Sequence, residues 1–220
     1  MPRKDYHGST NDRERSEKRL IAAVGEVIRS KGYTALTASN IARTAGLSRR
    51  LISTYFTSTE QLIETYVRSQ DYWVNAAGNA GKLLQENEGH DTRHILETLL
   101  HNQMEYFWKH DEMQKIVLWQ ISQRTQIMYE VCEERERLGD YFFTLSDKEL
   151  GKTDVDLRAV AGLLVAGIYY MILHCKMSDS LFCQIDLNKP EGFARVKRAI
   201  SSILKNTYKE AGDDKAVKDS

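Results

Sequence analysis

Apolar residues recur every three or four positions along most of the chain, which is the spacing of one face of an α-helix. In residues 14–31, for example, Leu20, Val24 and Val27 fall on the same face, and Gly32 follows as a helix-ending residue. No segment shows the sustained alternation of apolar and polar residues that is typical of a half-buried β-strand. The pattern therefore predicts an all-α protein with about nine helices.

Residues that cap helices mark several of the expected helix ends. Thr37 and Ser48 each precede a short apolar stretch, and Ser58 forms a capping box with Gln61. Pro190 suits the first turn of the last helix, where no N–H group is needed. The predicted helices cover residues 14–31, 37–46, 49–56, 58–83, 92–110, 112–122, 125–145, 154–177 and 191–209.

Charge is distributed unevenly, although the 220-residue chain has no formal net charge. Residues 1–70 contain 12 lysines and arginines and 7 acidic residues, whereas the remaining 150 residues contain 19 and 24. A basic first third followed by an acidic remainder indicates that only the N-terminal part meets a polyanion such as nucleic acid.

The sequence does not show the residue spacings that are typical of a metal site or a catalytic site. The cysteines Cys132, Cys175 and Cys183 form no Cys-x-x-Cys pair, and the six histidines are not spaced as metal ligands. The sequence also has no glycine-rich phosphate loop, no His-Glu-x-x-His pattern and no Gly-x-Ser-x-Gly elbow. We therefore expect no catalytic site, no metal and no cofactor, and reduced cysteines in a cytoplasmic protein.

The most informative segment is residues 36–63, with the sequence LTASNIARTAGLSRRLISTYFTSTEQLI. It predicts two short helices joined by a tight turn at Gly46, which is the layout of a helix-turn-helix. Ala42 and Ala45 are small enough for the helices to approach closely, and Ile52 and Phe56 can hold the second short helix in place. In such a motif the second helix enters the major groove of DNA.

This segment resembles the TetR family of bacterial repressors. The positions that match the family pattern are Thr37, Ile41, Ala42, Ala45, Gly46, Ser48, Ile52, Phe56, Ser58, Glu60, Leu62 and Ile63. Two positions depart from it, because the family commonly has tyrosine in place of Ser53 and lysine in place of Thr59. Both of those family residues usually touch the DNA backbone, and we expect Arg49, Arg50 and Tyr55 to compensate for their loss.

The resemblance implies a DNA-binding domain followed by a helical domain that binds an effector and forms a homodimer. We expect these at residues 1–57 and 58–210, with a polar tail at residues 211–220. Arg49 and Arg50 are expected to contact phosphates or guanines, and Leu51 a thymine methyl group. The full set of expected DNA contacts is Thr37, Ser39, Ser48, Arg49, Arg50, Leu51, Ser53, Thr54, Tyr55 and Thr59.

Two C-terminal helices are candidates for the dimer interface. Residues 154–177 are apolar nearly all round, so in a soluble protein this helix must be covered on more than one side. The uncharged part, residues 159–175, is at the lower limit of length for a membrane span, and we expect no membrane partner. The expected interface residues are Ala159, Gly162, Ala166, Val196, Ile200, Ile203 and Leu204. The alternative is that both helices are core helices of a monomer.

Aromatic residues and methionines are concentrated in the middle of the chain, where members of the family usually hold an effector pocket. Such pockets are mostly apolar and have a few polar anchors. The expected lining residues are Trp73, Phe107, Trp108, Trp119, Gln123, Tyr129, Tyr170 and His174. For each of them, simple core packing is the alternative.

The sequence thus predicts a ligand-responsive transcriptional regulator, a repressor that binds an inverted-repeat operator as a homodimer and is released by a small apolar effector. Two alternatives stay open at this point. One is an all-helical small-molecule-binding protein or enzyme without DNA binding, and the other is an interaction scaffold that has lost DNA binding.

Overall fold

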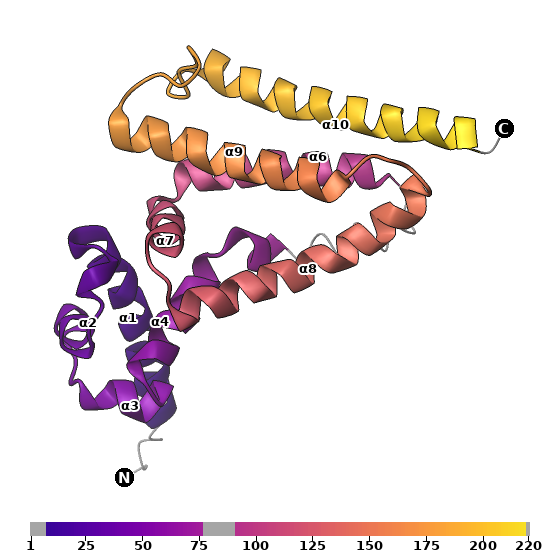
Figure 1. Cartoon of the computed structure of the whole chain (residues 1–220). Coiled ribbons are helices and arrows are strands. Elements are labelled where there is room, and N and C mark those ends of the chain that lie inside the picture. Colours follow the sequence, from indigo (N-terminus) through magenta and orange to yellow (C-terminus); the bar gives the residue numbers. More distant parts are fainter. Residues whose placement is uncertain (1–7, 77–90, 219–220) are drawn as a thin grey trace, which may run out of the picture. The chain divides into compact units, whose positions relative to one another are not determined.

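The structure is a computed structural model that describes residues 8–76 and 91–218. Within those residues it is all-α and contains no strand, only an isolated bridge between Phe182 and Ile185, so the predicted fold class is confirmed. The helices, labelled in Figure 1, are α1 (Gly8–Lys31), η1 (Tyr33–Ala35), α2 (Ala38–Ala45), α3 (Arg50–Phe56), α4 (Thr59–Gln70), α6 (Thr92–Lys109), α7 (Asp111–Ser122), α8 (Gln126–Leu150), α9 (Leu157–Ser178) and α10 (Pro190–Lys218).

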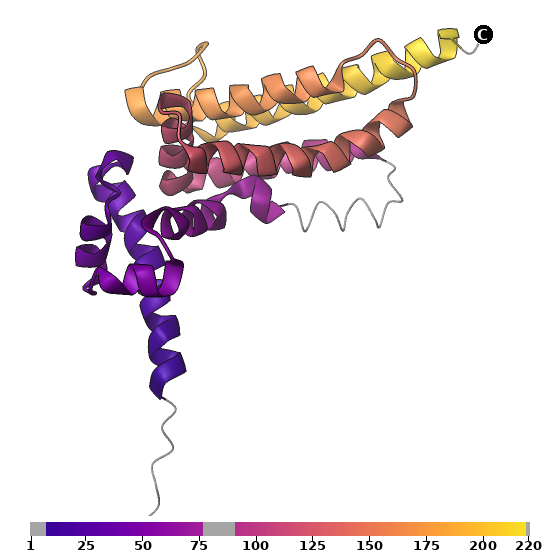
Figure 2. The same ribbon diagram turned by 60° about the horizontal axis from the view of Figure 1, so that its bottom comes forward.

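The first helix begins at Gly8, earlier than the predicted start at residue 14. Its first turns are polar in sequence, residues 12–15 are exposed, and Figure 2 shows this part of α1 extending beyond the other N-terminal helices. Ion pairs between side chains four residues apart, Arg13 with Glu17 and Lys18 with Glu14, both at 2.7 Å, support this polar part of the helix. The hydrophobic pattern misses it because it buries no apolar side chain.

The fourth helix is shorter than predicted, and the expectation of one continuous helix from Ser58 past Trp73 is wrong. α4 ends at Gln70, and Asp71 has an extended backbone (φ −75°, ψ 121°) with a buried side chain. A new helical segment then begins at residue 72 and is described as far as residue 76. Leu83, the predicted end, lies outside the described residues.

The last helix is longer than predicted. α10 runs from Pro190 to Lys218 and does not end at residue 209, so residues 211–218 are helical and do not form an irregular tail. Ala211 is buried, which shows that packing continues beyond the predicted end. α8 likewise continues to Leu150, past residue 145.

Contacts between residues divide the chain into two compact units. Unit 1 comprises Met1–Asp71 and Asp111–Val131, and unit 2 comprises Tyr72–His110 and Cys132–Ser220. This division differs from the expected domain boundary after residue 57, because α4 and α7 pack with the N-terminal helices.

Unit 1 is built around α1, which packs against α2, α4 and α7. At Gly25 the helices α1 and α4 approach so closely that a Cβ atom would lie 2.4 Å from the Tyr66 hydroxyl oxygen. The buried core of the unit consists of Leu20, Ala23, Val24, Val27, Ile28, Ile41, Ala42, Ala45, Ile52, Phe56, Leu62, Ile63, Tyr66, Val67, Ile116, Trp119, Met128 and Val131.

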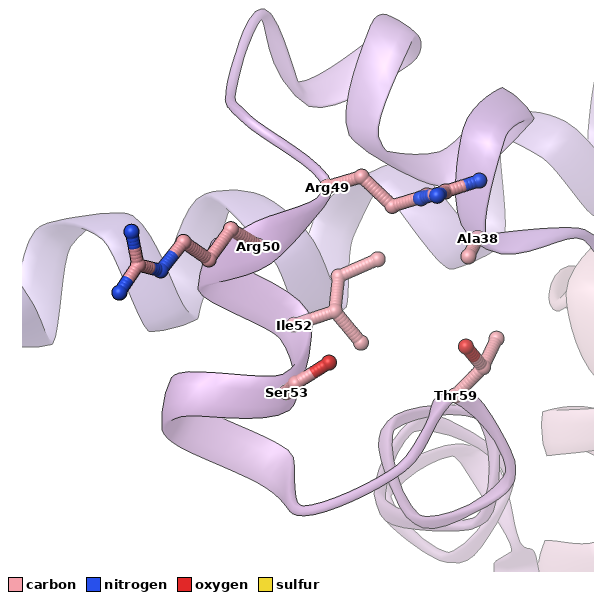
Figure 3. A pocket seen from close by; sticks show the side chains of 6 residues that line it. All are labelled: Ala38, Arg49, Arg50, Ile52, Ser53 and Thr59. Atoms are coloured by element: carbon pink, nitrogen blue, oxygen red, sulfur yellow. The ribbon is translucent and has the colours of Figure 1, made fainter.

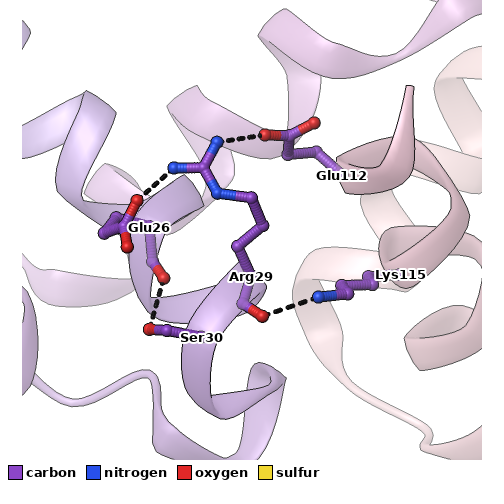
Figure 4. A network of polar contacts seen from close by, with 5 residues as sticks. All are labelled: Glu26, Arg29, Ser30, Glu112 and Lys115. Atoms are coloured by element: carbon purple, nitrogen blue, oxygen red, sulfur yellow. Dashed lines mark hydrogen bonds and ion pairs between the residues drawn. The ribbon is translucent and has the colours of Figure 1, made fainter. Parts of the chain in front are cut away.

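Polar contacts also hold α7 against α1 (Figure 4). Arg29 donates to Glu112 at 2.8 Å and is also paired with Glu26, while the Lys115 ammonium donates to the Arg29 carbonyl at 2.7 Å. The two carboxylates raise the pKa of the Arg29 guanidinium, with the hydrogen bond to Glu26 as the largest cause. These contacts are exposed, so they fix the position of α7 more than they stabilise the fold.

In unit 2, α6 packs against both α9 and α10. On the α10 side, Trp108 meets Phe193 edge-on with ring centroids 5.9 Å apart, and Lys197 forms an ion pair with Glu105. At the start of α6, the Thr92 hydroxyl lies 2.6 Å from a Glu149 carboxylate oxygen and 2.8 Å from the Tyr208 hydroxyl. α9 is long and apolar enough to cross a membrane by length and composition, and 28% of its apolar window is buried among the residues that the structure describes.

The packing of α7 predicts a clear contrast between two isoleucines on that helix. Ile116 is 0% exposed in the core of unit 1, whereas Ile121 is 68% exposed. Ile116→Ala should lower the free energy of unfolding by about 2–5 kcal/mol, because it leaves a cavity. Ile121→Ala should change it by no more than about 0.5 kcal/mol. Urea unfolding followed by circular dichroism compares them, and equal losses would show that α7 does not belong to this core.

Candidate nucleic-acid interface

Short-range hydrogen bonds fix the start of α2. The Thr37 hydroxyl accepts from the Asn40 backbone N–H at 3.2 Å, so the predicted N-cap is confirmed. The Asn40 side chain donates to the Ala35 carbonyl at 2.9 Å and ties α2 to the preceding η1 turn. Ile41, Ala42 and Ala45 are buried, which leaves the opposite side of this short helix to solvent.

The turn between α2 and α3 is a Schellman motif. Gly46 adopts the left-handed conformation (φ 62°, ψ 36°), its N–H donates to the Arg43 carbonyl at 3.1 Å, and the Leu47 N–H donates to the Ala42 carbonyl at 2.9 Å. The Arg19 guanidinium of α1 donates to the Ala45 carbonyl at 2.7 Å. The carbonyl groups at the end of α2 therefore accept hydrogen bonds both from the turn and from α1. These bonds fix the conformation of the turn and so the direction of α3.

The second short helix, α3, turns an apolar side to the core and a polar side outward. Ile52 and Phe56 are buried, whereas Arg49, Ser53 and Thr54 are exposed. Two expected DNA contacts, Leu51 and Tyr55, are only half-exposed, because they pack against the core of unit 1. The Arg13 guanidinium lies 5.4 Å from the centre of the Tyr55 ring.

A hollow of about 320 Å³ lies beside α3 and reaches the first residues of α2 and α4 (Figure 3). Arg49 extends across it toward Ala38, whereas Arg50 points away from it. Ser53 and Thr59, the two departures from the family pattern, face the hollow from α3 and from the start of α4. Ile52 forms its apolar floor.

The remaining predicted DNA contacts lie at the helix starts. Thr37, Ser39 and Ser48 are exposed, and the Ser48 hydroxyl accepts from the Arg50 N–H at 3.2 Å, as expected of a residue that precedes α3. Ser58 accepts from the Gln61 N–H at 3.1 Å and caps α4, as its sequence position predicts. These caps orient the helix starts around α3.

The charges on α3 are available to a partner. Arg49 and Arg50 are exposed, and within the described part of the chain neither forms an ion pair. These two arginines carry N–H groups that can donate hydrogen bonds to phosphate oxygens and to the edge of a guanine base. This surface can therefore bind a nucleic acid without first breaking internal contacts.

Residues 20–66, from the middle of α1 to α4, match the family of bacterial regulatory proteins named tetR. This segment of the chain belongs to the TetR family. The match covers all of α2, the turn and α3, and it identifies this segment as the helix-turn-helix of these regulatory proteins. A comparison with curated proteins finds no match.

Solved structures show that the likeness to TetR-family proteins extends over most of the chain. FadR from Bacillus subtilis, a transcriptional regulator solved with stearoyl-CoA, is 16% identical with a TM-score of 0.63 over 85% of this chain and 96% of that one. A TetR-family regulator from Marinobacter aquaeolei is 17% identical, with a TM-score of 0.62 over 88% and 97%.

NalD from Pseudomonas aeruginosa, the secondary repressor of the MexAB-OprM multidrug efflux pump, is 15% identical with a TM-score of 0.59 over 89% of this chain and 96% of that one. At such identities the likeness establishes the fold shared by these proteins.

The residues expected to line an effector pocket are divided between the two units. Trp119 lies in the core of unit 1, where its ring stacks on Tyr33 at 5.6 Å, and Gln123 and Tyr129 of the same unit are exposed. The other five belong to unit 2. Of these, Trp73 donates to the Tyr169 hydroxyl at 3.1 Å.

The other four expected pocket residues in unit 2 make ring contacts within that unit. The Phe107 ring meets Tyr169 at 4.7 Å, and Trp108 carries the Lys176 ammonium over its face at 4.0 Å. Tyr170 and His174 instead stack with Phe182 near the end of α9.

The residues expected at the dimer interface fall into two groups. Ala159, Gly162 and Ala166 are exposed along one side of α9, as is Ile203 on α10. Val196, Ile200 and Leu204 are instead buried within the chain's own unit 2.

Sequence reasoning missed two residues that matter to these sites. Arg19 is one of several charged residues on α1, and nothing in its spacing indicates that it caps α2. Gln103 is a fully buried amide on α6, and a single glutamine among apolar residues gives no periodic signal.

The left-handed conformation of Gly46 generates a stability prediction. Gly46→Ala should destabilise the fold by about 1–2 kcal/mol, because a β-carbon is unfavourable in this conformation. The added carbon would also lie 3.1 Å from the Arg19 guanidinium that caps α2. Gly46→Asn should cost less, since asparagine tolerates the left-handed region. Thermal unfolding of the two variants tests this, and an alanine variant as stable as wild type would contradict the assigned turn.

Proposed function

We propose that the chain is a repressor that binds an inverted-repeat operator as a homodimer in the cytoplasm and is released by a small apolar effector. The observation that carries the proposal is the exposed, unpaired arginine pair at the start of α3. These arginines stand on a helix that Gly46, Arg19 and the core of unit 1 hold in place.

DNA recognition is assigned to α3 and the helix starts around it. In a helix-turn-helix the N-terminal residues of the second helix contact base edges, and Arg49 and Arg50 stand at that position. The two arginines point in different directions, so they are suited to separate partners, such as a base edge and a phosphate (Figure 3). Ser53 and Thr59 offer hydroxyl groups toward the hollow, in place of the tyrosine and lysine of the family pattern.

The alternative of a scaffold without DNA binding rests on those two departures. A hydroxyl group still donates a hydrogen bond to a phosphate oxygen, and the basic excess of residues 1–70 remains. The loss of one lysine removes one phosphate charge contact, which reduces affinity and its dependence on salt without abolishing either.

The uncovered side of α9 is the basis for the proposed homodimer. Leu163 is 75% exposed and lies beside Ala159, Gly162 and Ala166, which permit a second helix to approach closely. Ile203 of α10 is 43% exposed. Exposing this apolar stripe to water is unfavourable in free energy. A second copy of the chain, related by a two-fold axis, would cover it.

Effector control is proposed for unit 2, where the aromatic residues of α6 and α9 meet. FadR was solved with stearoyl-CoA, and NalD is a repressor, so this fold accommodates both ligand binding and repression. An effector would release DNA only to the extent that it binds the DNA-free state more tightly, and DNA would weaken effector binding by the same factor.

The assignment of α3 predicts the effect of removing its charges. Arg49→Ala with Arg50→Ala should weaken binding to promoter-region DNA by at least about tenfold and reduce the slope of affinity against salt. The matched control is Arg198→Ala with Lys205→Ala, which removes the same charge from exposed positions of α10. Fluorescence anisotropy measures both. Equal weakening by the two pairs would mean that only net charge matters and would contradict the assignment.

The dimer proposal predicts that a charge on the α9 stripe separates the subunits. Gly162 has open space around its α-carbon, so Gly162→Arg fits the single chain but places a guanidinium in the proposed interface. Light scattering should report a dimer for wild type and a monomer for this variant. Ile121→Arg, at an exposed position of α7, should remain dimeric. A monomeric wild type at micromolar concentration would refute the proposal.

A further inference from the structure

Gln103 is buried without a partner for its side chain. It is 0% exposed, and neither its amide nitrogen nor its amide oxygen has a hydrogen-bond partner. Buried polar groups are hydrogen-bonded in the large majority of cases, because burying an amide without a partner is unfavourable. The missing hydrogen bonds of such a buried amide are supplied by an internal water or by a bound ligand.

The position of Gln103 on α6 shows which side of the helix is involved. His101 lies 3.1 Å from the Lys197 carbonyl of α10, and Trp108 meets Phe193 of the same helix. At 100° per residue, Gln103 points away from that side. It shares its face of α6 with Leu100 and Phe107, one turn away in each direction, and both are buried.

Aromatic side chains gather at this face of α6. The Phe107 ring packs against Tyr169 of α9, and the Trp73 indole donates to the Tyr169 hydroxyl at 3.1 Å. The Tyr72 hydroxyl donates to the Leu99 carbonyl at 2.8 Å, so this polar group already has a partner. Burial raises the pKa of the Tyr72 hydroxyl, and it therefore stays neutral.

We propose that Gln103 is the polar anchor of the effector site in unit 2, and that the effector is a neutral, largely apolar molecule carrying one group that both donates and accepts a hydrogen bond. A primary amide on the protein offers an oxygen acceptor and an N–H₂ donor, so a carboxamide or lactam satisfies both ends at once. The apolar remainder of the ligand would lie among the aromatic residues of α6, α9 and residues 72–76.

We infer a neutral ligand because the described residues of unit 2 provide no buried cation to balance an anionic group at Gln103. Among the described residues of unit 2, the buried polar groups are Thr92, Gln103, Ser146 and Thr207, and no buried lysine, arginine or histidine accompanies them. A carboxylate or phosphate at Gln103 would be desolvated without a counter-charge. This inference rests on the proposed function in one respect, namely that unit 2 holds the effector site.

The test compares three probes of equal alkyl length on the full chain: octanamide, methyl octanoate and octanoate. Octanamide presents a donor and an acceptor, the ester only an acceptor, and octanoate a charge. Isothermal titration should give octanamide an affinity at least about tenfold higher than the other two, because the ester has no donor for the Gln103 amide oxygen and octanoate buries a charge. Gln103→Leu should remove this preference.

The ligand-free protein supplies a second readout. Gln103→Leu removes the unsatisfied amide at nearly constant volume, so its Tm should lie above that of wild type. Gln103→Met, which keeps the length of the side chain, is the alternative variant if leucine packs badly. Asn102→Leu, at the neighbouring exposed position of α6, is the matched control and should not alter the order of probe affinities.

Three results would overturn the proposal: no binding of octanamide, equal affinity for the three probes, or a lower Tm for both Gln103 variants. The last result would mean that an internal water or another partner satisfies the amide. DNA binding measured on the same preparations keeps the two proposals distinguishable. Retained DNA binding with no octanamide preference would remove only the Gln103 site, whereas lost DNA binding with a retained preference would remove only the repressor function.

Discussion

The two helices that we propose to bind DNA are too short to be stable alone. α2 has 8 residues and α3 has 7, whereas isolated helices shorter than about 12–15 residues are marginal in water. Their geometry therefore depends on burying Ile41, Ile52 and Phe56 in a core that α1, α4 and α7 complete. Everything that is proposed about the surface of α3 follows from this burial, since it decides which side chains remain outside.

The same constraint explains why α7 belongs to the DNA-binding unit. Ile116 and Trp119 supply apolar surface that the four N-terminal helices do not provide by themselves, and the contacts of Arg29 with Glu112 and Lys115 fix how α7 lies on α1. The chain passes directly from α6, which carries Gln103, to α7 after His110. The proposed effector site and the core that supports α3 are therefore consecutive along the chain.

Sequence reasoning succeeded where local chemistry decides the structure. The caps at Thr37 and Ser58 and the left-handed Gly46 follow from side-chain type and spacing alone, and all three are confirmed. It failed where packing between distant parts of the chain determines the structure. The helix break at Asp71 has no proline or glycine to mark it, and the Asp71 side chain is buried there.

The placement of α7 could not be predicted either. Its apolar pattern shows that one side is buried, but the pattern is the same whether that side packs on α1 or on α6. Trp119, which its sequence position predicts beside a ligand, stacks on Tyr33 in the core of unit 1. The sequence gives no signal for Gln103 for a related reason. Its side chain is notable because it has no hydrogen-bond partner, and only the three-dimensional surroundings show this.

The central claim is that two copies of α3 read DNA sequence together. Selection of bound duplexes from a random-sequence library by the purified full chain, followed by sequencing, tests it most directly. The account predicts an enriched inverted repeat whose half-sites lie one helical turn apart or a multiple of it, about 10 base pairs or a multiple. Enrichment of no sequence, or of a single site without a two-fold related copy, would contradict it.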